Sequence, residues 1–440
     1  MHIVKRLNIL IVAHELSPKQ GSECAVGWNI VTNLSKYHNL TVIYAKTNQF
    51  QTSDYESSVK EYFTNKEEFL GLKLVPVPQP KTTIFFVKIN SLIKSETSAI
   101  GFAPLYYTGY KAWQKKAFQT ASILLKESKF DIVHQLTSIS FREPGYLWQL
   151  NVPFVWGPCS GLVKIPTSFY GILTLKEIGF ELLRKTANFF QSNFSYRINR
   201  AINKASIIYP VTIDDLIYFK SRTKFDVRQM LDVGTYLRLN NNISIKNNDN
   251  SPLKLLWIGR LVYTKALDLL LYALNLDTRL NEKIELTIIG DGPLFNRYQD
   301  LSVKLNLVNI TWLGNISHNQ VFSQLQNSDV LVQTSIKEAT SAVILEALTF
   351  GLPVICHDAF GMSYAINETC GIKIPLITPN KSIEGFSKAI LKLTSQPEEL
   401  ARLKKGAINR AKELSWNSMA MTIANDYLTI HKNHENTINK

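Results

Sequence analysis

Short apolar segments alternate with longer amphipathic segments along most of the chain. In the first half, the apolar segments occupy residues 8–13, 40–45, 72–77, 130–134, 152–157 and 205–211. In the second half, they occupy residues 253–259, 284–290, 309–314, 329–335 and 352–357. Strands that alternate with helices are typical of a parallel, doubly wound α/β sheet. The pattern therefore predicts two doubly wound, Rossmann-like units.

A polar, asparagine-rich stretch separates the two halves. Residues 240–252 read NNNISIKNNDNSP and end in proline, a composition typical of a linker. We expect an N-terminal domain over residues 1–238, a linker over 239–252 and a C-terminal domain over 253–414. Residues 415–440 predict an amphipathic crossover helix that packs back towards the N-terminal domain, because no strand follows it. Ligands of such sheets bind at the carboxyl ends of the strands, here in the cleft between the two domains.

Composition describes a well-packed globular protein. Of its 440 residues, 45% are hydrophobic and 19% are charged. The four cysteines lie far apart with no C-x-x-C spacing, so neither a disulfide framework nor a zinc site is indicated and a cytoplasmic setting fits. No apolar run approaches 18 residues, and the run at 8–13 is too short for a signal peptide, so we expect a buried strand there and no spanning helix.

The net charge of +14 is concentrated in the first half of the chain. Residues 1–250 hold 30 Lys and Arg against 18 Asp and Glu, whereas residues 251–440 hold 19 against 17. This distribution favours an anionic partner or surface near the N-terminal domain. It is equally explained by solubility alone.

Two glutamates flank a stretch of small, apolar and hydroxylated residues, SIKEATSAVILEALTFGLPVI (335–355). The pattern places Glu338 in a strand-to-helix loop and Glu346 a turn or two inside the helix. Backbone N–H groups near Thr340 and Ser341 would then point out of the helix N-terminus, a position that favours phosphate. Ionised carboxylates suit the hydroxyl pairs of sugars. The segment therefore predicts a site for a ligand that carries both groups.

Two cations follow the first strand of the C-terminal half. The segment WIGRLVYTKALDLLLYAL (257–274) places Arg260 at the end of a strand and Lys265 at the start of the next helix. Cations in these positions can clamp a diphosphate. Alone they would be ordinary surface cations; the glutamate pair favours the clamp. The segment 288–298 lacks the third glycine of a dinucleotide fingerprint, so we expect a tight turn there.

The N-terminal half offers weaker signals. In HELSPKQGSECAVGW (14–28), Gly21 and Ser22 precede a helix and would let the backbone approach an anion. His134 closes the apolar run FDIVH, which places it at a strand end facing the cleft. A lone histidine can equally be a structural residue.

Together, the segments GRLVYTK, IIGDGPL, WLGNIS and SIKEATSAVILEALTFGLPVI resemble the nucleotide-binding domain of the retaining glycosyltransferases of family 4, which have the GT-B fold. The E-x7-E spacing, with G-R-x4-K upstream, carries most of the resemblance. The N-terminal G-S-E-x-x-V-G-W and D-I-V-H elements agree with it. The resemblance covers nearly the whole chain.

The resemblance implies a role for each candidate residue. Arg260 and Lys265 would bind the donor diphosphate, and Glu346 would bind the ribose hydroxyls. Glu338 and His134 would be catalytic, with Glu338 against the transferred sugar and His134 touching it from the acceptor side.

The resemblance also implies backbone contacts. Gly21 and Ser22 would approach the diphosphate, Thr340 and Ser341 would contact phosphate and sugar, and the segment from Leu313 to Ile316 would read the base. The family commonly has glycine where this chain has Ala339, so no particular sugar follows.

The implied reaction is a front-face displacement with retention, in which the leaving phosphate takes the acceptor proton. No metal and no cofactor are implied, because basic side chains take the metal's role. The expected donor is a UDP- or GDP-sugar.

Two basic, aromatic-rich amphipathic stretches, 82–95 and 172–190, bear on the acceptor. They fit either core helices or helices that lie in an anionic membrane interface. In the second case, the acceptor would be a lipid-linked saccharide at the cytoplasmic face of the membrane. Otherwise it would be a glycan, and surface polysaccharide assembly is the expected pathway in either case.

Other functions stay open on sequence alone. A nucleotide-sugar epimerase or a phosphorylase would keep the cleft, and a catalytically silent scaffold would keep the fold. A nucleic-acid-binding protein would explain the charge but not the glutamate pair, and the chain has no nucleic-acid recognition motif, so no nucleic-acid partner is expected.

Overall fold

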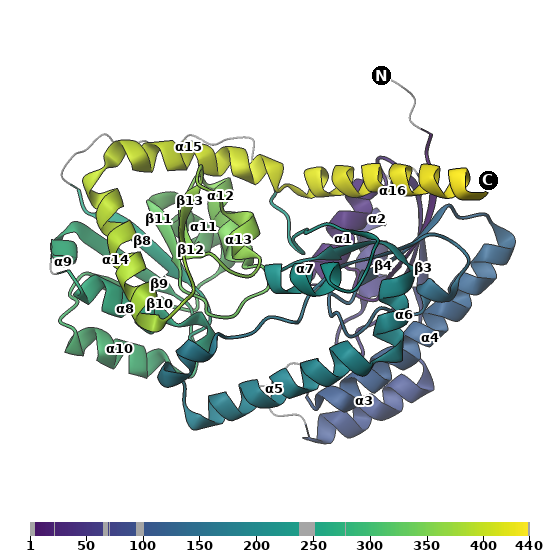
Figure 1. Ribbon diagram of the computed structural model, residues 1–440, viewed down its shortest axis with the longest axis horizontal. Helices are drawn as coiled ribbons and strands as arrows, with labels where there is room; N and C mark the ends of the chain where they lie inside the picture. Colours follow the sequence, from purple (N-terminus) through teal and green to yellow (C-terminus); the bar gives the residue numbers. More distant parts are fainter. Residues whose placement is uncertain are drawn as a thin grey trace.

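The computed structural model describes residues 5–21, 23–64, 69, 71–93, 101–236, 251–277 and 279–438. Within these residues the chain forms two parallel sheets that lie side by side and are each flanked by helices (Figure 1). We call the part built on the first sheet the N-terminal domain and the part built on the second the C-terminal domain. The fold class predicted from the sequence is confirmed. Most of the predicted linker falls outside the described residues.

The described part of the N-terminal domain contains a seven-stranded sheet in the order β3-β2-β1-β4-β5-β6-β7. Its strands are β1 (Asn8–Ala13), β2 (Asn39–Ala45), β3 (Leu72–Val77), β4 (Ile132–Thr137), β5 (Phe154–Cys159), β6 (Ala205–Pro210) and β7 (Asp226–Val227). Its helices are α1 (Glu23–Leu34), α2 (Tyr55–Thr64), α3 (Lys81–Ile93), α4 (Ala103–Glu127), η1 (Leu147–Gln149), η2 (Thr167–Ile172), α5 (Leu175–Phe194), α6 (Tyr196–Lys204) and α7 (Ile213–Lys220).

The described part of the C-terminal domain contains a six-stranded sheet in the order β10-β9-β8-β11-β12-β13. Its strands are β8 (Leu253–Ile258), β9 (Ile284–Ile289), β10 (Ile310–Gly314), β11 (Val330–Gln333), β12 (Val354–His357) and β13 (Gly371–Ile374). The remaining helices are η3 (Tyr263–Lys265), α8 (Leu267–Asn275), α9 (Arg279–Lys283), α10 (Phe295–Lys304), α11 (His318–Asn327), α12 (Ala342–Thr349), α13 (Met362–Ala365), α14 (Pro379–Ser395), α15 (Pro397–Glu413) and α16 (Trp416–Ile438).

Both sheets reverse their strand order at one internal position. In the N-terminal domain, β1 lies between β2 and β4; in the C-terminal domain, β8 lies between β9 and β11. The loops on either side of such a switch point diverge and leave a crevice at the carboxyl ends of the strands. The two crevices are therefore the places where the fold itself favours ligand binding.

The last helix crosses from one domain to the other. In Figure 1, α16 runs along the top of the molecule from the end of α15 onto the N-terminal domain. Trp416, Ile423 and Tyr427 of α16 are buried in the same apolar core as β1 and β4. The predicted crossover helix is confirmed, and it completes the N-terminal core.

A segment after β5 packs against the C-terminal domain. Ile165 and Phe169, which belong to this segment and to η2, form an apolar cluster with Ala266, Leu269 and Ile336 of the C-terminal domain. This contact holds the N-terminal domain beside the loops that follow β8 and β11.

Candidate active site

The loops after β8 and β11 are tied to each other by hydrogen bonds. The hydroxyl of Thr334 donates to the carbonyl of Lys265 over 2.8 Å, and the N–H of Ile336 donates to the carbonyl of Thr264 over 2.9 Å. The indole of Trp257 donates to the Thr334 hydroxyl over 3.1 Å. Because both loops leave the sheet at the same switch point, these bonds fix the position of the side chains they carry.

Lys265 and Glu338 form an ion pair across these loops. Both side chains are partly buried, so water and salt weaken their attraction less than they would weaken that of a surface pair. Lys265 lies in η3 rather than at the start of a long helix, but the structure does bring the predicted cation to the predicted carboxylate. Arg260 lies in the same loop, directly after Gly259.

Glycines allow the loop after β9 to pack against the loop that carries Arg260. A Cβ atom on Gly290 would lie 2.0 Å from the carbonyl oxygen of Gly259, and one on Gly292 would lie 2.5 Å from that of Leu261. Gly290 also has a φ of +126°, which favours glycine. The segment predicted as a tight turn thus supports the Arg260 loop.

The structure places the second glutamate inside α12. Glu346 lies in the middle of this helix, with one carboxylate oxygen 3.8 Å from Nε2 of His318. Ser341 is the N-cap residue, and its hydroxyl accepts a hydrogen bond from the Gln333 side chain over 3.2 Å. The Ser341 hydroxyl therefore anchors the helix to β11 and, among the described residues, makes no capping hydrogen bond to the first-turn N–H groups.

The remaining candidates on this side lie at the same edge of the sheet. Leu313 belongs to β10 and Ile316 to the loop after it, and both pack against the apolar cluster that includes Leu345 and Leu348 of α12. Gly314 between them has a φ of +62° and accepts a hydrogen bond from Gly290. The segment predicted to read a base therefore adjoins the loop that supports Arg260.

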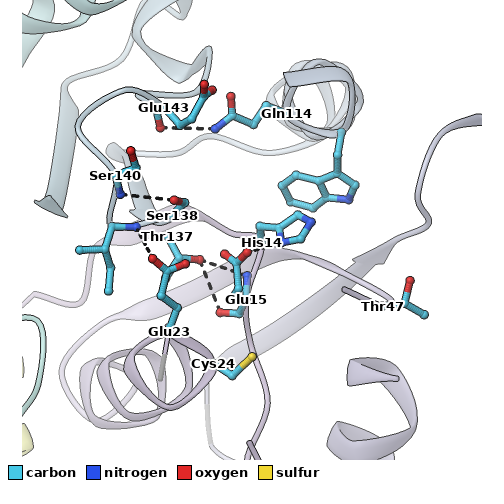
Figure 2. Close-up of polar contacts among 12 residues, drawn as sticks. His14, Glu15, Glu23, Cys24, Thr47, Gln114, Thr137, Ser138, Ser140 and Glu143 are labelled. Atoms are coloured by element: carbon cyan, nitrogen blue, oxygen red, sulfur yellow. Dashed lines mark hydrogen bonds and ion pairs between the residues drawn. The ribbon is translucent and has the colours of Figure 1, made fainter. Parts of the chain in front are cut away.

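The N-terminal switch point carries a different set of groups, which Figure 2 shows. Glu15 follows β1 and Glu23 begins α1, and Thr137 ends the neighbouring strand β4. The Glu15 N–H donates to the Thr137 hydroxyl over 3.2 Å, and the Ile139 N–H donates to the Glu23 carboxylate over 3.3 Å. One Glu15 oxygen lies 2.7 Å from Nδ1 of His14. The other Glu15 oxygen is buried and has no hydrogen-bond partner among the residues that the structure describes.

The position of Glu23 at this edge changes its protonation. Burial, and next the negative charge of Glu15, raise the pKa of Glu23 to about 8. Glu23 is then protonated near neutral pH and can donate a hydrogen bond. Perturbed carboxyl groups in a crevice are typical of functional sites. Neither glutamate was predicted as a site residue, although both lie in the segment HELSPKQGSECAVGW (14–28).

Gly21 is exposed, and a Cβ atom added there would contact no described residue within 4 Å. The approach of a ligand to Gly21 stays a prediction. Ser22 lies outside the described residues.

The predicted position of His134 is wrong. His134 lies inside β4, which continues to Thr137, and its side chain is fully buried. Its Nδ1 lies 2.5 Å from the Tyr427 hydroxyl of α16, and its Nε2 lies 2.6 Å from the carbonyl of Gly157. Burial lowers the pKa of His134 to about 4, so the ring is neutral. The histidine joins α16 to the sheet and does not reach the cleft.

Two further contacts join the domains near these edges. Asp232, which follows β7, is buried close to Thr340 and Glu338, and burial raises its pKa to about 6. Glu181 of α5 forms an ion pair with Lys337 and accepts a hydrogen bond from the Tyr263 hydroxyl over 2.9 Å. Glu181 thereby bonds to a neighbour of Glu338 and to a residue two positions before Lys265.

Within the described part of the chain, no three His, Cys, Asp or Glu side chains are grouped as a metal site would require.

Solved structures with the same architecture identify the fold. The chain aligns with sucrose-phosphate synthase from Thermosynechococcus elongatus at 16% identity and a TM-score of 0.58, covering 97% of this chain and 99% of that one. It aligns with the lipopolysaccharide outer core galactosyltransferase WaaB at 18% identity and a TM-score of 0.61, covering 96% and 99%. The two facing α/β domains with a crossover helix are the GT-B fold.

Sequence comparison finds similar proteins for the C-terminal part of the chain. Residues 240–410 match the family described as Glycosyl transferases group 1. D-inositol 3-phosphate glycosyltransferase of Streptomyces bingchenggensis is 28% identical over 184 residues, which are 39% of this chain and 39% of that protein. Glycogen synthase of Mycobacterium tuberculosis is 27% identical over 180 residues, 40% of this chain and 42% of that protein. The matched segments thus span less than half the length of these relatives, and the family match itself covers residues 240–410 of this chain.

Proposed function

We propose that this protein is a retaining glycosyltransferase that moves a sugar from a nucleoside-diphosphate sugar to a glycan or lipid-linked saccharide. The carrying observation is the Lys265–Glu338 ion pair at the C-terminal switch point, with Arg260 in the same loop. In this proposal residues 253–414 bind the donor and residues 1–238 bind the acceptor, with 239–252 as the linker and 415–440 as the crossover helix. The family of residues 240–410 supports it.

The proposed chemistry follows from the charges at this edge. Negative charge builds on the β-phosphate as the nucleoside diphosphate leaves, and Arg260, Lys265 and the N-terminus of α12 stabilise it. Glu338 contacts the transferred sugar, Glu346 accepts hydrogen bonds from the ribose hydroxyls, and the leaving phosphate takes the acceptor proton. His134 has no part in this scheme, because it is buried away from the cleft.

The names of related structures guide the choice of donor and acceptor. A structure of Anabaena Alr3699/HepE, which aligns with a TM-score of 0.57, is a complex with UDP, so UDP-sugars are the first donors to test, with GDP-sugars next. WaaB acts on the lipopolysaccharide outer core, by its name, which supports bacterial surface polysaccharide assembly as the pathway.

Helix α5 supports a membrane-bound acceptor. Its buried residues are all polar, namely Glu181, Asn188 and Ser192. Its large apolar residues face solvent, and Leu183 and Phe194 expose 69% and 71% of their surfaces. An amphipathic helix that packs its polar side inward presents an apolar face to a partner or a bilayer interface.

Helix α3 shows a related arrangement. Phe85 and Leu92 are exposed beside Lys81 and Lys88, and in Figure 1 both α3 and α5 run along the lower edge of the molecule. No helix within the described residues is long and apolar enough to span a bilayer. We propose that the protein binds peripherally to an anionic membrane at its cytoplasmic face, through α3 and α5.

The test is a donor panel of UDP-, GDP-, ADP- and CDP-sugars with wild type and Lys265→Met. We expect one donor to raise the Tm of the wild type, because a ligand that binds the folded state stabilises it. The wild type should also hydrolyse this donor slowly and release its nucleotide. Lys265→Met should show neither effect. Conversion of a donor to its epimer without nucleotide release would instead establish the epimerase alternative. If no donor binds or reacts, the transferase proposal fails.

A further inference from the structure

A cavity of about 320 Å³ lies between α5 and the segment that follows β5. Its polar and charged lining includes Lys164, Glu181, Arg184, Lys185, Asn188 and Asp214. The cavity lies at the carboxyl edge of the N-terminal sheet, because its walls follow β5 and β6.

The cavity has more positive than negative charge available to a ligand. Among the described residues, Lys164, Arg184 and Lys185 form no ion pair within 4 Å. The carboxylate of Glu181 is already engaged by Lys337 and Tyr263. Cations that lack partners on the protein are the usual recognition groups for phosphate.

Further positively charged side chains lie at or near the cavity. Arg142 donates a hydrogen bond to the side chain of Asn188, which lines the cavity. Like the three cavity cations, Arg142 forms no ion pair with the described residues. Burial, and after it the positive charge of Arg184, lower the pKa of both Arg142 and Lys337, as expected where like charges are near one another. Asp214 is the other acid in the lining; burial raises its pKa, and the positive charge of Lys164 partly opposes that rise. A bound anion would relieve this repulsion.

The cavity adjoins the proposed sugar-transfer site. Glu181 in its wall bonds to Lys337, the neighbour of Glu338. The donor diphosphate has its own cations, Arg260 and Lys265, on the opposite domain. An anion in the cavity would therefore belong to the second substrate.

We propose that this cavity binds a phosphate group of the acceptor, held by Lys164, Arg184 and Lys185. The inference rests on the proposed transferase function and specifies its acceptor as a phosphate ester. The phosphate can be carried by a membrane lipid or by a soluble sugar phosphate, since both present the same group to the cations.

The first test is calorimetric titration of inorganic pyrophosphate, with and without saturating nucleoside diphosphate. We expect pyrophosphate to bind in the presence of the nucleotide. Arg184→Gln and Lys164→Gln should each weaken this binding at least tenfold, or about 1.4 kcal/mol. The control Lys176→Gln, an exposed position of α5 outside the cavity lining, should bind as wild type does. Lys164 is exposed, so its substitution should leave folding intact.

Two results would overturn the proposal: pyrophosphate binding that the nucleotide abolishes, or binding that neither cavity variant changes. Failure of the transferase function gives a different outcome, because nucleotide binding would then be absent while pyrophosphate binding still depended on Arg184.

A second titration identifies the source of the phosphate. Dodecyl phosphate that binds more tightly than ribose 5-phosphate, and loses its binding in Arg184→Gln, would indicate a lipid carrier. Equal binding of the two probes, again dependent on Arg184, would indicate a soluble acceptor. Binding of both probes that is independent of Arg184 would contradict the site.

Discussion

The two switch points of this protein have the same topology and opposite chemistry. At the C-terminal edge, a lysine pairs with a glutamate, and an arginine lies in the same loop as the lysine. At the N-terminal edge, Glu15 and Glu23 lie close to each other, and Glu23 keeps its proton near neutral pH. The first edge suits an anionic ligand and the second suits hydroxyl groups. The difference supports a division between a diphosphate donor and a hydroxylated acceptor.

The largest effect should come from the charged edge. Glu338→Gln keeps the size of the side chain but removes the charge of the carboxylate that pairs with Lys265. We expect kcat to fall by about 10²- to 10³-fold, as when a single stabilising group is removed from an active site. Steady-state nucleotide release measures this, with Glu368→Gln, an exposed site in the same domain, as the control. A kcat within threefold of wild type would show that Glu338 does not contribute to catalysis. The contrast between a catalytic C-terminal edge and the N-terminal edge would then be wrong.

The second effect distinguishes a structural role of His134 from a catalytic one. His134→Gln should leave the Tyr427 hydroxyl and the Gly157 carbonyl poorly paired in the core. We expect the free energy of unfolding to fall by about 2–4 kcal/mol, measured by urea denaturation. The kcat of the folded protein should change by less than about twofold, since no transition-state contact is lost. Normal stability with a large loss of kcat would instead make His134 catalytic.

The third effect concerns Glu23 and pH. Between pH 4.5 and about 8, folded Glu23 holds a proton that the unfolded chain has released. Its contribution to stability therefore falls as pH rises through this window and is fully lost above about pH 8. Glu23→Gln cannot lose a proton, so its Tm relative to wild type should rise between pH 5 and pH 8. Parallel pH profiles for the two proteins would show that the acidic edge is not perturbed.

The sequence predicted the C-terminal edge well because its chemistry is local. Arg260 and Lys265 follow one strand, and Glu338 and Glu346 follow another, so spacing alone places them at one edge of a sheet. The sequence also predicted the longer apolar strands, including the edge strands β3 and β10. Two strands were missed: β7 has two residues, β13 has four, and both lie at sheet edges.

The N-terminal edge depends on contacts that spacing does not reveal. Glu15 meets Thr137 only because β1 pairs with β4, more than a hundred residues later. The apolar run ends at His134, but β4 continues through buried polar residues to Thr137, so the strand end was placed too early. For α5, the periodicity predicted two faces but not that the polar face packs inward.

The most direct test of the donor edge is calorimetric binding of UDP, GDP, ADP and CDP to wild type and Glu346→Ala, with Glu368→Ala as the control. We predict micromolar binding of one diphosphate and at least a tenfold loss in Glu346→Ala, about 1.4 kcal/mol or more, with no loss in the control. Equal binding to wild type and Glu346→Ala, or no binding of any nucleotide, would contradict the assignment of the donor to the C-terminal switch point.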